Sequence, residues 1–176
     1  MAARSINGFV PLIYLRSMVD IRSAAPADSA VLARLRYDFR TRNTAGDEDR
    51  NAFLARCEAW MRERLGEGGL WRCWIAEQAG SPVGSIWLNL IEKIPNPAPE
   101  TECHAYITNF YVLEEMRGQG VGSRLLNEPL DWCREQGVHA AILWPSDRSR
   151  PLYERHGFAV REDLLELIIH SPLAGK

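Results

Sequence analysis

The hexapeptide Arg117-Gly118-Gln119-Gly120-Val121-Gly122 is the part of the sequence best suited to bind a charged ligand. It follows an apolar run typical of a strand and precedes apolar residues at helical spacing, so it falls in a strand-to-helix turn. Glycine in a helix costs about 0.5–1 kcal/mol relative to alanine. Because glycine has no side chain, several backbone N–H groups can face one hollow at the positive end of a helix dipole. The turn is therefore a candidate phosphate or pyrophosphate site, and a tight turn without a ligand is the alternative.

Two common nucleotide motifs fit this turn poorly. The P-loop ends in Gly-Lys-Ser/Thr, whereas Gly122 is followed by Ser123 and Arg124. The dinucleotide fingerprint needs an acidic residue about twenty positions further on, and residues 140–143 contain none. Neither motif accounts for the glycines.

The turn resembles the signature of the GNAT superfamily of acyl-CoA-dependent N-acyltransferases, which is Gln/Arg-x-x-Gly-x-Gly/Ala after a strand. A second signature of that superfamily, Leu-Tyr-x-x-x-Gly-Phe, is matched by residues 152–158. The resemblance covers residues 18–170. It implies an α/β (α+β) fold with a mixed, mostly antiparallel central sheet, a parallel β-α-β splay at the cofactor site, and helices on both faces.

Acetyl-CoA is the cosubstrate that the resemblance implies. The backbone N–H groups of the turn would hold its pyrophosphate, and the strand edge before the turn would pair with the pantetheine amides like an added strand. Ser146 stands where many relatives have an asparagine, so its contact to the cofactor depends on a shorter polar side chain. The expected cofactor-binding residues are Phe110, Tyr111, Val112, Arg117, Gly118, Gln119, Gly120, Val121, Gly122, Ser123 and Ser146.

Tyr153 matches the superfamily position whose hydroxyl faces the CoA sulfur. A phenol with an ordinary pKa near 10 can protonate a thiolate whose acid has a pKa near 8.5, so Tyr153 is the expected general acid; the alternative is a packing role in the core. Glu102 and His104 share one face of a predicted strand and are the candidate bases for the amine. Both have the alternative of being solvated residues at a strand's beginning.

The hydrophobic pattern predicts a single domain at residues 18–176 after an N-terminal extension at 1–17. Apolar residues at period two, or in continuous runs, indicate the strands, and spacings of three and four indicate the helices. The expected strands are 19–22, 71–77, 83–91, 103–113, 138–144, 158–161 and 164–170. The expected helices are 26–42, 47–65, the segment from Leu125 to the residue before Gly137, and 149–156. Residues 138–144 are apolar enough for a strand covered on both faces.

The composition of the 176 residues excludes several protein classes. A net charge of −2 argues against a nucleic-acid binder. The four cysteines form no C-x-x-C pair and have no histidine at zinc spacing, so neither a disulfide framework nor a metal site is expected. No apolar run approaches the length that spans a membrane, and we expect a cytoplasmic protein without a membrane partner.

Together these observations predict an enzyme, an acetyl-CoA-dependent N-acetyltransferase that transfers acetyl to a primary amine by direct attack in a ternary complex. The alternative is a non-catalytic acyl-CoA-binding sensor module. The partner would be a small-molecule or peptide amine, held by residues 40–50 and 92–101, which match no subfamily. The sequence leaves a homodimer open.

Overall fold

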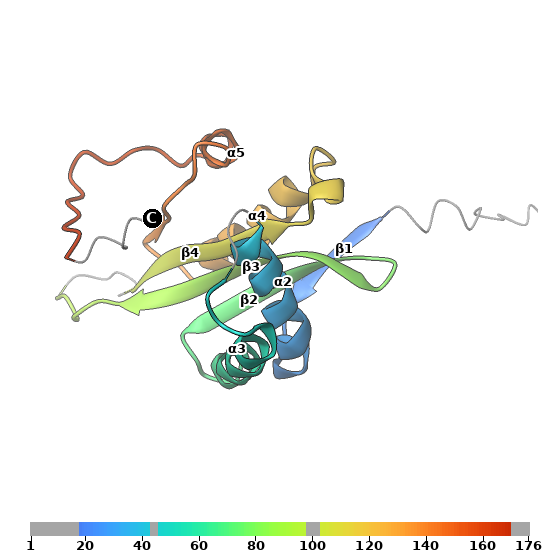
Figure 1. Ribbon diagram of the computed structural model, residues 1–176. Coiled ribbons are helices and arrows are strands. Elements are labelled where there is room, and N and C mark those ends of the chain that lie inside the picture. Colours follow the sequence, from blue (N-terminus) through green and yellow to red (C-terminus); the bar gives the residue numbers. More distant parts are fainter. Residues whose placement is uncertain (1–17, 43–45, 98–102, 170–176) are drawn as a thin grey trace, which may run out of the picture. The chain divides into compact units, whose positions relative to one another are not determined.

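The computed structural model describes residues 18–42, 46–97 and 103–169, so the predicted extension at 1–17 lies outside the described residues. Contacts between residues divide the chain into two units, at 1–144 and 145–176, and we describe each by itself. The first unit is built on a five-stranded sheet, in the order β1-β2-β3-β4-β5. Figure 1 labels the first four of these strands. Its strands are β1 (Val19–Ser23), β2 (Trp71–Gln78), β3 (Ser81–Glu92), β4 (Cys103–Val112) and β5 (Ala140–Ile142). Its helices are η1 (Pro26–Asp28), α2 (Ser29–Thr41), α3 (Arg50–Arg64), η2 (Glu114–Met116) and α4 (Val121–Glu135).

The sheet is mixed, as predicted. Its first four strands pair antiparallel in sequence order, whereas β4 and β5 are parallel neighbours joined through α4. The β2–β3 hairpin turns through Ala79 and Gly80, both with positive φ, which is the conformation that a two-residue hairpin of type I′ needs. The predicted β-α-β splay is confirmed at β4, α4 and β5.

Helices cover both faces of the sheet, which follows from the alternation of side chains along β2. Cys73 and Ile75 belong to the core formed with α2, α3 and β3. Trp74 points the other way, and its ring lies 6.3 Å from that of Trp132 on α4. Successive strand residues face opposite sides, so α2 and α3 pack on one face and α4 on the other. The core on the first face consists of Leu32, Ala33, Met61, Cys73, Ile75 and Trp87.

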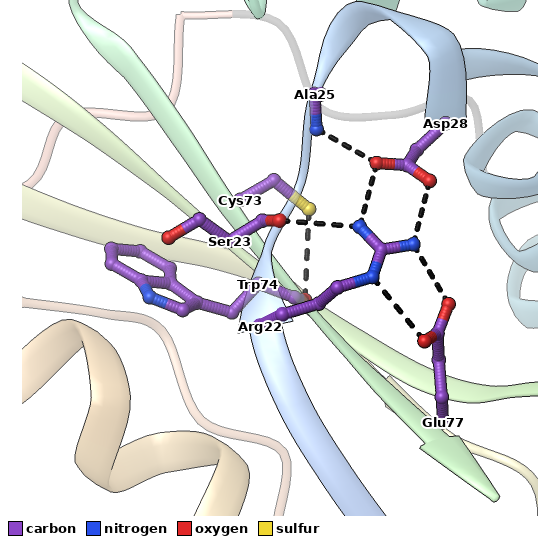
Figure 2. Close-up of polar contacts among 7 residues, drawn as sticks. All are labelled: Arg22, Ser23, Ala25, Asp28, Cys73, Trp74 and Glu77. Carbon is purple, nitrogen blue, oxygen red and sulfur yellow. Dashed lines mark hydrogen bonds and ion pairs between the residues drawn. The ribbon is translucent and has the colours of Figure 1, made fainter. Parts of the chain in front are cut away.

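Arg22 ties the end of β1 to the start of the helical layer. Its guanidinium donates to both carboxylate oxygens of Asp28, at 2.9 and 2.8 Å, and to both of Glu77 on β2, at 3.2 and 2.7 Å (Figure 2). The Asp28 carboxylate also accepts from the Ala25 N–H at 2.7 Å. The arginine beside it holds the pKa of Asp28 below its usual value. This network fixes where η1 leaves the sheet, and therefore where α2 begins.

Two predicted features of the C-terminal part are wrong. The apolar run 138–144 forms only the three-residue β5, whose residues are half-buried because it pairs with β4 on one side and with no other described strand. The predicted strands at 158–161 and 164–170 do not form over the described residues 158–169. Strand-forming composition does not suffice without a pairing partner, and Leu165 is 93% exposed.

The described residues of the second unit, 145–169, contain one short helix, α5 (Arg150–Arg155), at the position predicted for 149–156. Beyond it, residues 158–169 follow an irregular path in which Val160, Leu164, Leu167 and Ile169 are also exposed. Over the described ranges of both units, none of the helices combines the length and apolar character needed to cross a membrane.

Candidate active site

The glycine turn is constrained by backbone conformation rather than by crowding. Gly118 and Gly120 have φ of +73° and +79°, and a Cβ added at either would meet nothing within 4 Å. Gly120 is the N-cap of α4 and offers no side-chain acceptor to the first N–H groups of that helix. Those groups remain for a ligand, and the helix dipole favours an anionic one. The turn therefore has the geometry that the phosphate interpretation requires.

The side chains of the turn point back toward β4 and η2. Arg117 donates from Nε to the Val112 carbonyl at 3.1 Å and from Nη1 to the Glu114 carboxylate at 2.8 Å. Gln119 donates from Nε2 to the Glu115 carbonyl at 2.7 Å. These bonds hold the turn in shape from the protein side. The Arg117 N–H also donates within the protein, to the Glu114 carbonyl at 3.1 Å, so the expected contact of its backbone N–H with the cofactor is not available in this structure. The predicted contribution of Gln119 to cofactor binding is through its backbone N–H.

The strand before the turn has an open edge. The parallel strand β5 pairs only with His104, Ala105 and Tyr106, so no described strand pairs with residues 107–112 on that side. The edge includes the predicted pantetheine-binding residues 110–112. An extended amide chain could add there as a further strand. Tyr111 itself is buried, with its ring 5.4 Å from Phe39 on α2, so its side chain packs while its backbone lies on the edge.

A β-bulge distorts β4 beside this edge. Trp87 pairs with Thr108 and Ser85 with Tyr111, which leaves two β4 residues opposite one residue of β3. Asn109, in the bulge, has a φ of +48°. Asparagine tolerates this left-handed conformation better than most residues, and bulges commonly lie next to active sites. Asparagine inside an apolar strand was the sequence signal for this feature, and our sequence interpretation missed it.

Helix α2 contacts the bulge through Arg36, a second residue absent from the sequence prediction. Its Nη1 donates to Asn109 Oδ1 at 3.0 Å, across 73 positions of sequence. Arg36 is half-buried at the margin of the apolar stripe that contains Leu32, Leu35 and Phe39. The sequence signal for this contact was a charged residue directly beside the apolar stripe of the helix.

Of the two candidate bases, the structure describes only His104. Glu102 lies outside the described residues. His104 lies half-buried near the start of β4, and its ring stacks on that of His139 with centroids 5.6 Å apart. The structure thus puts His104 on the same strand as the open edge, and its role as a base stays a prediction.

Tyr153 and Ser146 belong to the second unit. Tyr153 is 7% exposed and its ring lies edge-on to Phe158 at 5.7 Å. Burial raises the pKa of Tyr153 to about 12, partly offset by a hydrogen bond with Ser149. Ser146 is exposed, and its Oγ lies 2.9 Å from Ser149 Oγ in the turn before α5. Tyr153 is a weaker acid than the free phenol assumed from sequence, but it keeps its proton across the physiological range.

The described residues contain no group of three or more His, Cys, Asp or Glu side chains placed to hold a metal ion. The structure brings residues 110–112 and 117–123 together around the end of β4. Within the second unit it places Tyr153 and Ser146 on and before α5. The roles of Tyr153 and Ser146 in this chain stay predictions from the two signatures.

Comparisons with known proteins agree with both signatures. A probable N-acetyltransferase of Mycobacterium tuberculosis, Rv2775, is 27% identical over 159 residues, which are 82% of each chain. A GCN5-related N-acetyltransferase from Ralstonia eutropha JMP134 is 26% identical, with a TM-score of 0.68 over 86% of this chain and 99% of the other. A predicted acetyltransferase from Clostridium acetobutylicum, whose structure contains acetyl-CoA, has a TM-score of 0.71 at 24% identity, over 86% and 96% of the chains. Residues 32–158 match the model of the acetyltransferase (GNAT) family, and the chain belongs to that family.

Proposed function

We propose that this protein binds acetyl-CoA and transfers its acetyl group to a primary amine by direct attack in a ternary complex. The observation that carries the proposal is the combination, at the end of β4, of an open strand edge with a glycine turn that caps a 15-residue helix. An extended chain with amides and a pyrophosphate at one end is the ligand whose parts fit both features. The acetyl-CoA in the Clostridium relative supports the same choice.

The cofactor is held in this proposal mainly by backbone. The N–H groups of residues 118–122 and of Ser123 in the first turn of α4 bind the pyrophosphate, whereas the Arg117 N–H donates to the Glu114 carbonyl. The edge at Phe110, Tyr111 and Val112 pairs with the pantetheine amides. Ser146 supplies a hydroxyl in place of the asparagine of many relatives.

In the chemical step the amine nitrogen attacks the thioester carbonyl carbon, and the C–S bond of the resulting tetrahedral intermediate breaks. The departing thiolate takes a proton from Tyr153, and the new amide nitrogen loses its extra proton to a base, for which His104 and Glu102 are the candidates. Low polarity around Tyr153 raises the pKa of its phenol. The same surroundings would raise the pKa of a thiol placed there, which keeps the proton transfer feasible.

Three of the four cysteines favour direct transfer over an acetyl-cysteine intermediate. Burial raises the pKa of Cys57 and Cys73, and raises that of Cys133 to about 11, so little thiolate is available from these residues at neutral pH. Intact-mass spectrometry after incubation with acetyl-CoA alone checks this step. We expect no stoichiometric adduct, and a single acetyl group on a cysteine would contradict direct transfer.

Release of free CoA, followed with a thiol reagent across a broad panel of amines, tests the function itself. We expect release that depends on the amine, together with thermal stabilisation by acetyl-CoA. If acetyl-CoA stabilises the protein but no amine causes release of CoA, the non-catalytic sensor is favoured. If acetyl-CoA neither stabilises the protein nor releases CoA with any amine, the proposal is contradicted.

A further inference from the structure

Arg36 on α2 is a cation to which the described residues offer no matching anion. Its guanidinium carries five N–H donors, and in the described part of the chain it makes one hydrogen bond, to the neutral amide of Asn109, and lies 5.9 Å from the centre of the Phe39 ring. The other half-buried arginines of the described residues have stronger acceptors. Arg64 pairs with Glu63 and Arg117 with Glu114, and Arg72 donates to the Gly69 and Trp71 carbonyls.

The surroundings of Arg36 disfavour its charge. Loss of water around the half-buried guanidinium lowers its pKa, and the positive charge of Arg40, one helical turn further on, lowers it again. Among the described residues, the neighbours able to carry negative charge are the Cys57 thiol and the Tyr106 phenol. Groups of these two kinds are ordinarily neutral at pH 7. A desolvated charge is costly unless it is paired, so an anion absent from the described residues would stabilise this position.

The same helix face borders a pocket of about 490 Å³. Arg40 lines it together with Tyr37, Thr41 and Phe53, and Asp47 and Glu48 line it from the loop before α3. Glu48 is paired with Arg56, at 2.6 Å, and Arg40 forms no ion pair with a described carboxylate. Two like charges one turn apart destabilise a helix slightly. Arg36 and Arg40 therefore form a cationic pair, which links the pocket to the bulge of β4.

Arginine suits one class of ligand here. Its planar fork matches the two oxygens of a carboxylate or phosphate, which a single lysine ammonium does not. Arg36 contacts Asn109, next to the edge to which the proposal assigns the pantetheine arm. An anion bound between Arg36 and Arg40 would thus belong to the second substrate, and its amine would point toward the strand.

We infer that Arg36 and Arg40 form a subsite for an anionic group, carboxylate or phosphate, on the acceptor, so that this enzyme acetylates amines that also carry a negative charge. This inference rests on the proposed acetyltransferase function. It predicts that anionic amines are preferred over polycationic ones, which bring no anion to the two arginines.

Matched acceptor pairs test the inference. Amino acids are compared with their amides, phosphoethanolamine with ethanolamine, and spermidine serves as a polycation. We expect at least one anionic amine to exceed its neutral partner in kcat/KM by about tenfold or more, because the neutral partner leaves the arginines unpaired. The amino acid and phosphoethanolamine pairs distinguish a carboxylate from a phosphate.

The variant Arg36→Gln removes the charge and keeps hydrogen-bonding capacity. We expect it to raise KM for the anionic acceptor by about tenfold or more, and to leave the neutral partner within about threefold. Arg36→Lys should retain part of the preference. Arg34→Gln, on an exposed position of the same helix, is the matched control and should leave it unchanged.

Three results would overturn the inference. One is equal or better turnover of the neutral or polycationic amines by the wild type. Another is an equal loss with all acceptors in Arg36→Gln, which would mean that Arg36 only supports the bulge. If no amine in the panel is turned over, the proposed function has failed separately, and thermal stabilisation by inorganic phosphate is compared in the wild type and in Arg36→Gln. The glycine turn contributes equally to both proteins, so stabilisation of the wild type that does not exceed that of Arg36→Gln overturns the subsite.

Discussion

Tyr153 illustrates how one side chain can be structural and chemical at once. It is buried against Phe158, which is what a packing role requires, and burial raises its pKa to about 12, which keeps it protonated as an acid must be. Removing the hydroxyl while keeping the ring separates the two roles.

The variant Tyr153→Phe should reduce turnover by about 10²–10⁴, the usual range for a lost general acid, with little change in acetyl-CoA affinity. Steady-state kinetics and acetyl-CoA binding on one preparation check this. A purely structural Tyr153 would leave activity nearly intact and change the melting temperature only, because a lost buried hydrogen bond costs about 1 kcal/mol.

The raised pKa also gives Tyr153→Phe a signature in stability. In the unfolded chain tyrosine ionises near its ordinary value of 10, and in the folded protein near 12. The neutral folded form is therefore favoured below pH 10, and that contribution is lost as pH rises from 10 to 12. Denaturant unfolding over this range should show a steeper loss for the wild type than for Tyr153→Phe. Parallel curves would mean that Tyr153 is not buried in solution.

At the scale of elements, the site depends on how β4 ends and α4 begins. The strand loses its parallel partner after Tyr106, bulges at Asn109, and passes through two left-handed glycines into the helix. Each step exposes backbone groups that regular structure would pair. The same irregularities that weaken the sheet locally make the binding edge.

Gly120→Val should lower acetyl-CoA affinity and leave the fold largely intact. Nothing in the structure crowds a side chain at this position, so the variant acts by straining a φ of +79° and by filling the space that the phosphate interpretation gives to the ligand. Calorimetric titration with acetyl-CoA measures the effect.

Gly80→Val is a matched control, since Gly80 has a φ of +76° and equally open space in the β2–β3 turn. Both variants should lose comparable stability, and only Gly120→Val should lose affinity. Unchanged affinity in a well-folded Gly120→Val protein would remove the pyrophosphate assignment.

At the scale of the whole molecule, stability depends on contacts that join distant parts of the chain. The Arg22 network joins β1, η1 and β2, which are separated by 55 positions at its widest. Water reaches it, because the Arg22 side chain is 43% exposed. Its contribution to global unfolding is therefore moderate.

Asp28→Asn should lower the free energy of unfolding by about 1 kcal/mol at neutral pH, because one charge-assisted interaction with Arg22 is lost. The folded-state pKa of Asp28 lies below its ordinary 3.8, so this stability is present above pH 3.8 and is lost as pH falls through the folded value. Urea unfolding at several pH values should show the two proteins converging in acid.

Asp131→Asn is the control, because its pair with Arg134 lies on the exposed surface of α4 and should contribute little at any pH. The role of the network would be contradicted if both substitutions had the same effect on the free energy of unfolding. It would also be contradicted if the difference in that free energy between Asp28→Asn and the wild type persisted in acid.

The sequence by itself determined the β-α-β order, the glycine turn and the family, because these depend on local signals: periodicity, positive φ at glycine, and short motifs. The length of the strands could not be predicted from local signals. Residues 138–144 and 158–169 have strand composition, yet only three of them form a strand, since a strand exists only where a partner pairs with it. The contact between Arg36 and Asn109 likewise required the tertiary structure. It joins residues 73 positions apart, and no local pattern shows which face of a helix will meet a bulge in a strand.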